Sequence, residues 1–364
     1  MRIAVLGVGL IGGSIGLAAK RRLGAEVIGF DSEPFRLERA RGLGAIDAAA
    51  GSVAEAVRGA DLAACAAPVS ALPDLVGDVL AAAGPDAGVT DVGSTKRELV
   101  ERVGALAGAE RFVGGHPLAG AETSGVENAR PDLFDGARWY LTPTERTSGV
   151  AYDRVQRAVA GLGARPRAVD PAAHDRMMAA VSHLPHVVAN ALADSATVLL
   201  GGAAERLPEV GPSFRDATRV AGANPGIWTD IFATNRDAVA DQVEALAARL
   251  REAATLIRAG DPGALAEWHR RAGDERRRLL EAGRPGGALR ELRMTVTNRP
   301  GTVAEIALAL GRAGVNIEDM ALDPAPDMRT GAISVWVSGE PEAERTAEVI
   351  RRLGHSVTVV DSGR

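Results

Sequence analysis

Short apolar runs alternate with amphipathic stretches along the first 169 residues. Segments with a helical spacing of apolar residues, notably Gly12–Leu23 and Pro34–Leu43, separate runs that have the length and composition of buried strands. The strand-like runs are Ile3–Leu6, Glu26–Phe30, Leu62–Ala66, Val89–Val92, Phe112–Val113 and Trp139–Thr142. Strands that alternate with helices are typical of an α/β fold with a doubly wound sheet, which we therefore expect over residues 1–169.

The pattern changes twice in the rest of the chain. Residues 170–283 lack a strand-like run and hold long helical stretches such as Leu184–Leu200 and Ala238–Ala259, which predict an all-helical domain. Residues 284–287, Arg-Pro-Gly-Gly, have the composition of a linker. Residues 288–364 follow the order βαββαβ, which predicts a third, small domain with strands at Leu289–Val296, Asn316–Leu322, Ala332–Val337 and Ser356–Val360 and helices at Val303–Ala313 and Pro341–Leu353.

Composition narrows the class of protein. A chain of 364 residues with 46% hydrophobic and 24% charged residues suits two or three soluble domains. The net charge of −5 disfavours nucleic acid as a partner, and no apolar run is long enough to span a membrane. The single cysteine, Cys65, rules out a disulfide framework. Because no signal-peptide pattern follows Met1, we expect a cytoplasmic protein.

A glycine-rich turn connects the first predicted strand to the first predicted helix. Gly7 suits the tight turn, Gly9 lets the backbone approach a pyrophosphate, and Gly12 allows close packing of helix and strand. Asp31 ends the second strand, where a carboxylate binds the adenine ribose and repels a 2′-phosphate. The alternative is a glycine-rich turn beside a surface aspartate. We therefore predict a Rossmann-type domain that binds NAD through Gly7, Gly9, Leu10, Ile11, Gly12 and Asp31, with Ala67 and Pro68 on the far side of the cofactor.

The stretch Gly114–Gly120 places His116 between glycines and a proline. Such a setting predicts a histidine in a rigid loop, with glycines that admit a ligand closely, although a loop histidine without a role is the alternative. Ser94 follows the strand before it, so both side chains are expected to face the nicotinamide as catalytic groups. Glu122 lies further along the same loop and is a candidate for binding substrate.

The helical domain carries residues suited to an anionic substrate. We expect Ser182 or His183 to cap a new helix, with Pro185 in its first turn, so that Ser182, His183 and His186 lie at a helix N-terminus that attracts an anion. Arg215 and Arg219 are spaced for one helix face, and arginine is the natural partner of a carboxylate.

Other polar and aromatic residues are given structural interpretations. A zinc site at His183 and His186 would lack a third ligand, so we predict no metal. Trp228 is interpreted as a core residue. The three remaining histidines are interpreted as solvated or structural: His174, His269 and His355.

These motifs together resemble the TyrA family, the prephenate and arogenate dehydrogenases of tyrosine biosynthesis. The matching stretches run through most of the chain: Gly7–Gly12, Asp91–Lys96, Gly114–Gly120, Ser182–His186 and Phe214–Arg219, with a weaker match at Pro225–Trp228. The resemblance implies an NAD-dependent oxidoreductase that decarboxylates prephenate oxidatively to 4-hydroxyphenylpyruvate, with arogenate as the alternative substrate. It also implies a homodimer formed through the helical domain.

The resemblance assigns roles to individual side chains. His116 would accept the proton of the C4 hydroxyl as hydride leaves for NAD, and Ser94 would orient the histidine and that hydroxyl. Arg219 would bind the substrate carboxylate, and the turn Ser182–His186 would enclose the substrate.

The C-terminal domain looks like an ACT domain, a module that often binds amino-acid effectors between paired copies. The first strand runs into the turn Asn298–Gly301 before the first helix, and the motif Gly314–Ile317 opens the second strand. The resemblance implies an effector such as tyrosine bound by Asn298, Pro300, Gly301 and Asn316, although some ACT domains serve assembly alone.

Two rival functions can be weighed on the residue inventory. A β-hydroxyacid dehydrogenase shares the expected layout but uses a lysine in its second domain, and this chain has no lysine after Lys96. A catalytically silent NAD-binding regulator would need none of the set His116, Ser94 and Arg219. The inventory therefore favours a dehydrogenase.

Overall fold

The computed structural model describes residues 1–120, 123–199, 209–282, 289–297, 299, 301–325 and 330–360, in two compact units, Met1–Leu250 and Arg251–Arg364. Several predicted features lie outside the described residues, namely Glu122, the linker 284–287, Asn298 and Pro300. No helix among the described residues is both long and apolar enough to cross a membrane.

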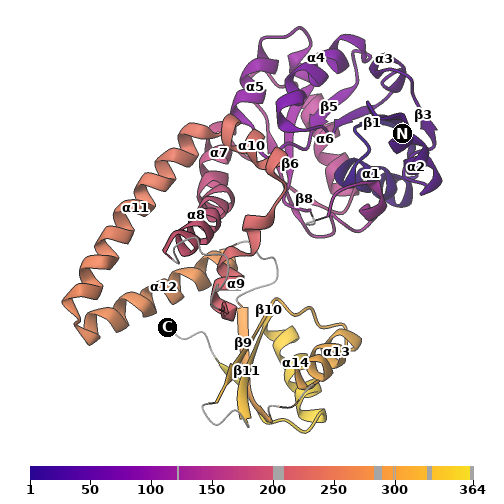
Figure 1. Cartoon of the computed structure of the whole chain (residues 1–364). Helices are drawn as coiled ribbons and strands as arrows, with labels where there is room; N and C mark the ends of the chain where they lie inside the picture. Colours follow the sequence, from indigo (N-terminus) through magenta and orange to yellow (C-terminus); the bar gives the residue numbers. More distant parts are fainter. Residues whose placement is uncertain are drawn as a thin grey trace. The chain divides into compact units, whose positions relative to one another are not determined.

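An eight-stranded sheet organises the first unit (Figure 1). The strand order is β3-β2-β1-β4-β5-β6-β7-β8, and all neighbours are parallel except β6 and β7. The carboxyl ends of the parallel strands therefore meet along one edge, where dinucleotides bind in such sheets. The strands are β1 (Arg2–Leu6), β2 (Glu26–Phe30), β3 (Ala48–Ala49), β4 (Leu62–Cys65), β5 (Gly88–Asp91), β6 (Phe112–Pro117), β7 (Arg138–Thr142) and β8 (Arg165–Ala168).

Helices cover both faces of this sheet. Alternate residues of β1 enter separate cores, Ile3 and Val5 on one face and Ala4 and Leu6 on the other. The first core is closed by α1 (Leu10–Ala18) with its π-helical extension η1 (Ala19–Leu23), α2 (Pro34–Gly42) and α6 (Gly149–Gly161). The second is closed by α3 (Val53–Ala56), α4 (Leu72–Ala82) and α5 (Arg97–Gly104). The doubly wound α/β prediction is confirmed.

The strand that carries His116 differs from its prediction. His116 lies within β6 and is paired with Tyr140 of β7, so the expected loop is wrong. Gly115 is buried, and a Cβ there would press on the carbonyl of Asp91 and the indole nitrogen of Trp139. The glycines thus allow close strand packing rather than ligand access. Two edge strands also went unpredicted, β3 and β8, because they are short and carry no apolar run.

A long bent helix opens the helical part of the unit. The helix α7 (Pro171–Met178) continues without a break through the π-helical stretch η5 (Ala179–His183) into α8 (Leu184–Leu199). The predicted cap at Ser182 or His183 is therefore wrong, and so is the anion site at a new helix N-terminus. Pro185 cannot donate to a carbonyl one turn back, and the wider π turn accommodates it inside the helix.

Shorter helices follow the long one. They are α9 (Pro212–Thr218), the 3₁₀ turn η6 (Arg219–Gly222), α10 (Pro225–Thr234) and α11 (Arg236–Ala259). The segment 170–283 contains no strand among its described residues, which agrees with an all-helical domain.

The second unit holds α12 (Pro262–Ala282) and a small antiparallel sheet in the order β10-β11-β9-β12. Along the chain the elements are β9 (Leu289–Thr297), α13 (Thr302–Arg312), β10 (Asp319–Pro324), β11 (Thr330–Ser338), α14 (Glu340–Arg352) and β12 (Val357–Val360). This is the predicted order βαββαβ. The apolar face of the sheet packs on both helices through Leu292, Val335, Ile306 and Ile350.

Candidate active site

The glycine-rich turn has the shape of a phosphate cradle. Gly7 adopts a φ of 96°, and a side chain there would collide with the carbonyl of Ala66. Gly9 faces open space, and no side chain caps the first amides of α1. Unpaired amides at a helix N-terminus bind the phosphates of a dinucleotide. The turn therefore fits the pyrophosphate of NAD.

Asp31 is held ready for a ribose. Its side chain is almost fully buried and accepts hydrogen bonds from the backbone amide of Val8 at 2.9 Å and that of Glu33 at 3.0 Å. These bonds tie the carboxylate to the glycine-rich turn. Ala67 and Pro68 follow the end of β4, the strand beside β1 in the sheet. Asp31 thus fits the adenine ribose of NAD, and the contact of Ala67 and Pro68 with the far side of the cofactor stays a prediction.

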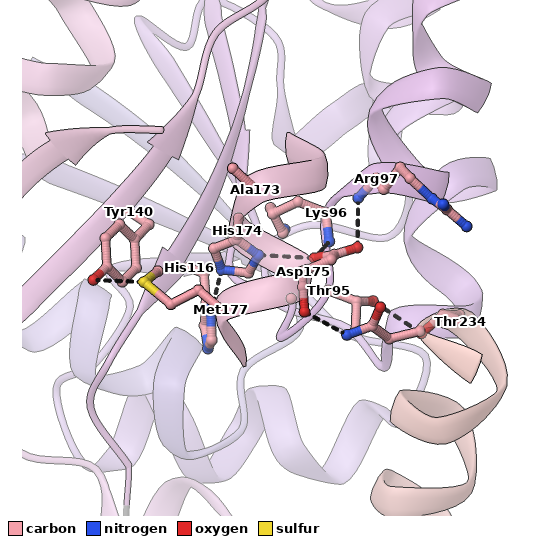
Figure 2. Close-up of polar contacts among 12 residues, drawn as sticks. Thr95, Lys96, Arg97, His116, Tyr140, Ala173, His174, Asp175, Met177 and Thr234 are labelled. Carbon is pink, nitrogen blue, oxygen red and sulfur yellow. Dashed lines mark hydrogen bonds and ion pairs between the residues drawn. The ribbon is translucent and has the colours of Figure 1, made fainter. Parts of the chain in front are cut away.

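His116 begins a chain of buried hydrogen bonds (Figure 2). Its Nδ1 lies 2.9 Å from Nε2 of His174, and Nδ1 of His174 lies 2.8 Å from Oδ1 of Asp175. His116 is half-buried, whereas His174 is fully buried. The histidine on the strand is thereby joined to two residues on α7.

The order of donors and acceptors in this chain follows from the carboxylate at its end. An ionised carboxylate only accepts, so Nδ1 of His174 carries a proton, and in the neutral ring Nε2 is then bare. That nitrogen can only accept, so Nδ1 of His116 donates to it. The second ring nitrogen of His116, Nε2, is left as a free proton acceptor. The chain therefore sets the tautomer that a general base needs.

The start of α5 anchors the carboxylate of Asp175. The backbone amide of Lys96 donates to Oδ1 at 2.8 Å, and that of Arg97 donates to Oδ2 at 2.9 Å (Figure 2). Amides at a helix N-terminus have no partner within the helix and favour negative charge. Both carboxylate oxygens are thus fixed, and with them the plane of the His174 ring.

Electrostatics keeps His116 neutral. Burial, followed by the neighbouring His174, Lys96 and His183, holds the pKa of His116 well below its ordinary value of 6.5. At neutral pH the ring is therefore unprotonated at Nε2 and able to accept a proton.

Ser94 lies between β5 and α5, at the same edge of the sheet as His116. Its side chain is half-buried and makes no hydrogen bond to any part of the chain that the structure describes. The structure thus places Ser94 in the expected region without joining it to His116, and its orienting role stays a prediction.

The substrate-side histidines pack around Trp228. The ring of His186 stacks on the indole with centroids 3.4 Å apart, and the ring of His183 meets the indole edge-on at 5.9 Å. His183 is buried, and its Nδ1 lies 3.2 Å from Nδ2 of Asn235. Burial is the main cause that lowers the pKa of His183 to about 4, so its ring is neutral. Trp228 is half-buried and contacts both histidine rings.

Arg219 lies close to His186, one of the two histidines that contact Trp228. Burial lowers the pKa of His186, a hydrogen bond with the backbone of Val220 raises it, and the charge of Arg219 lowers it. Arg219 opens η6, which packs on α8, and Arg215 lies on α9; both arginines are exposed. The structure therefore brings Arg219 close to His186, which contacts Trp228 as His183 does, and Ser182 is half-buried in the π turn before His183. Among the described residues no cluster of potential ligands could hold a metal ion.

Comparisons with known proteins agree with this geometry. The prephenate dehydrogenase nucleotide-binding domain matches residues 15–167, and the prephenate dehydrogenase dimerization domain matches residues 170–271. A prephenate dehydrogenase of Bacillus subtilis is 30% identical over 96% of this chain and 95% of its own length. The chain belongs to the prephenate dehydrogenase family.

Two solved structures of the family resemble the fold. Prephenate dehydrogenase of A. aeolicus, solved with hydroxyphenyl propionate and NAD+, is 32% identical with a TM-score of 0.70, covering 77% of this chain and 98% of that one. Arogenate dehydrogenase of Synechocystis is 28% identical with a TM-score of 0.65, covering 77% of this chain and 100% of that one.

The sequence alone did not reveal three residues of the hydrogen-bonded group around His116 and His183. His174 was interpreted as solvated or structural, yet it is fully buried and bonded to His116, and Asp175 and Asn235 were not singled out. Their bonds to His116, Arg97 and His183 span 52 to 78 residues of the chain, so no local motif marks them. The one local signal was the pair His174–Asp175 just after the helix cap Asp170.

Replacing Asp175 by asparagine tests the tautomer assignment. A carboxamide cannot accept from His174 and from both amides of α5 at once, so it disfavours the basic Nε2 of His116. We expect Asp175→Asn to lower kcat by about 10²-fold or more while NAD affinity is kept.

The matched control is Asp170→Asn, on the same helix, because asparagine caps a helix as well as aspartate does. Steady-state kinetics of both variants gives the comparison. Equal kcat values for Asp175→Asn and Asp170→Asn would contradict the assignment.

Proposed function

We propose that this chain catalyses the NAD-dependent oxidative decarboxylation of prephenate to 4-hydroxyphenylpyruvate, CO2 and NADH. The observation that carries the proposal is the bare Nε2 of His116, held at the carboxyl edge of a sheet whose glycine-rich turn fits NAD. A neutral base at that edge suits removal of a hydroxyl proton while hydride leaves the same carbon.

The residues support each transfer in the reaction. NAD, when bound, supplies the acceptor for the hydride from C4 of prephenate. Nε2 of His116 takes the proton of the C4 hydroxyl, and the resulting carbonyl withdraws electrons from the ring. The bond from C1 to the carboxylate then breaks, CO2 leaves, and its electron pair makes the ring aromatic. His116 returns its proton to the phenolate oxygen, so the base is regenerated and atoms and charge balance.

The substrate carboxylates are assigned to the group around Trp228. We place the ring carboxylate or the pyruvyl carboxylate against Arg219, because a guanidinium forms paired hydrogen bonds with a carboxylate. His183, His186 and Ser182 are proposed to enclose the same carboxylate, with burial lowering the pKa of both histidines. Ser94 is proposed to contact the C4 hydroxyl. A contribution of Glu122 rests on the sequence alone.

Replacing His116 by asparagine removes the proposed base and keeps a side chain of similar size. We expect NADH formation from prephenate to fall by about 10²- to 10⁴-fold, because a positioned base contributes that much. NAD affinity should stay unchanged, since His116 lies away from the glycine-rich turn in the sequence and the strand order. The measurement is NADH absorbance in the presence of NAD and prephenate, with NAD binding followed separately.

The same assay with arogenate decides between the two substrates, which differ in a pyruvyl or an alanyl side chain. We expect the wild-type kcat/KM to be higher for prephenate. Higher kcat/KM for arogenate would reassign the substrate, and no NADH from either one would leave a silent NAD-binding regulator.

We also propose that the protein is a homodimer joined through residues 170–283. The helix α8 exposes apolar side chains, with Val188, Leu192 and Val198 at 37%, 38% and 69% exposure. Exposed apolar groups along one helix are typical of a protein interface. A second copy of the same segment is the partner that the matched dimerization domain suggests.

A cytoplasmic location is proposed from the chemistry of the only cysteine. Cys65 is a buried free thiol, and burial raises its pKa well above the ordinary value. An unpaired thiol suits a reducing compartment.

The C-terminal sheet is proposed to be an ACT-type regulatory module with an amino-acid effector such as tyrosine. A cavity of about 380 Å³ lies where β9 turns into α13. Gly301, with a φ of 91°, forms the turn, and Arg299, Thr302 and Ala304 line the cavity beside it. Asn316 bonds to Glu318 instead and is not part of the lining.

Filling this cavity tests the regulatory proposal. We expect tyrosine to inhibit the wild-type enzyme and Ala304→Trp to weaken that inhibition by about tenfold or more, because the indole would occupy the effector's place. The measurement is the tyrosine concentration that halves NADH formation.

Leu308→Trp is the control, since Leu308 is exposed on the same helix and does not line the cavity. Inhibition that is equal in both variants would place the effector elsewhere. A wild-type enzyme indifferent to tyrosine would limit the module to assembly or to another effector.

A further inference from the structure

A buried ion pair lies directly behind the strand that carries His116. Lys96 and Asp91 are each completely buried, and Nζ of Lys96 contacts Oδ2 of Asp91. The chain has only one other lysine, Lys20, which lies at the surface in a pair with Asp47. The motif Asp91–Lys96 therefore places an ion pair in a fully buried position, where burial lowers the pKa of Lys96 and the neighbouring Asp91 opposes that effect.

The two side chains bind both backbone groups of one residue, Gly115. Nζ of Lys96 donates to the carbonyl of Gly115 at 2.8 Å, and the amide of Gly115 donates to Oδ1 of Asp91 at 2.9 Å. The amide of Gly93 donates to the other oxygen of Asp91 at 2.7 Å. Gly115 is the residue before His116, so the ion pair fixes the backbone from which the catalytic ring projects.

The sheet explains why side chains are needed here. Strands β5 and β6 pair only at Val89 with Phe112 and at Thr90 with Val113. Beyond these pairs β6 turns to its antiparallel neighbour β7, and Gly115 has no backbone partner on β5. Buried amides and carbonyls must be paired, and Asp91 and Lys96 supply the two bonds that the strand ladder no longer offers.

Lys96 also holds the opposite end of the hydrogen-bond chain. Its backbone amide donates to Oδ1 of Asp175, the oxygen that accepts from His174 (Figure 2). One residue thus fixes the strand before His116 through its side chain and the carboxylate behind His174 through its main chain. The spacing between His116 and His174 depends on both contacts.

Stability alone does not account for this pair. A buried ion pair loses much of its attraction to desolvation, and apolar residues of similar size often serve a core equally well. The charge of Lys96 does act on His116, whose pKa it lowers together with burial and with the rings of His174 and His183. The ionisable groups that surround His116 from the packed elements are Asp91, Lys96, Tyr140, His174, Asp175 and His183.

We propose that Lys96, paired with Asp91, is a positioning residue for proton transfer, which holds His116 and the chain to Asp175 in the arrangement that makes His116 a base. The proposal rests on the proposed dehydrogenase function. It concerns how the base is held and charged, not contact with substrate.

The test replaces Lys96 by methionine, with Lys20→Met as the matched control. In Lys96→Met we expect kcat to fall by about tenfold or more while NAD affinity stays within about twofold. The acid limb of kcat/KM should move to higher pH, because a positive charge near His116 is gone. Lys20→Met should match the wild type in kcat, in NAD affinity and in the acid limb of kcat/KM.

The change in the pKa of His116 can also be measured in the absence of catalysis. Titration of the His116 ring by NMR in the substrate-free protein should give a higher pKa in Lys96→Met than in the wild type. A wild-type protein inactive on prephenate would refute the proposed function, and this titration would still test the role of Lys96.

A folded Lys96→Met protein with wild-type kcat and an unmoved acid limb would overturn the proposal. So would losses of kcat and NAD affinity in equal proportion without a change in the pH profile, because that is the result of general structural damage. If the single variant does not fold, the double variant Asp91→Asn/Lys96→Met removes both charges and is judged by the same measurements.

Discussion

The hydrogen-bond chain from Asp175 through His174 to His116 is the constraint on which the site depends. The carboxylate sets which atoms donate and which accept along this chain. Both oxygens of Asp175 accept hydrogen bonds from backbone amides in the first turn of α5. Each later bond follows from that choice, and the last one leaves Nε2 of His116 bare. The bare Nε2 of His116 therefore depends on the position at which α5 begins.

Separate parts of the fold are arranged to keep this chain in place. The divergence of β6 from β5 opens a gap that Asp91 and Lys96 fill, and the continuous helix from α7 through the π turn carries His174, Asp175 and His183 on one rigid element. A π turn in a helix frequently lies at a functional site. Here it lets one helix present His174 to His116 and His183 to Trp228.

The sequence predicted the features that are formed by residues close together in the chain. The turn Gly7–Gly12 and Asp31 could be recognised because strand, turn and helix N-terminus are neighbours in the chain. His116 was identified, but its place within β6 was not, because the partner strand β7 lies about 25 residues away and the glycines resemble a loop. Pro185 was taken for a helix start, since a proline inside a helix needs the π turn that only the folded chain shows. His174 acts through its contact with His116, which is 58 residues away in the sequence, so no local pattern predicts that contact.

The tautomer of His116 is the most direct test of this account. Nitrogen-15 chemical shifts of the histidine rings distinguish a protonated ring nitrogen from a bare one, and His116 can be assigned by the signals that His116→Asn removes among six histidines. At neutral pH the account predicts a neutral ring with the proton on Nδ1 and a bare Nε2. A proton on Nε2, or on both nitrogens, would contradict it.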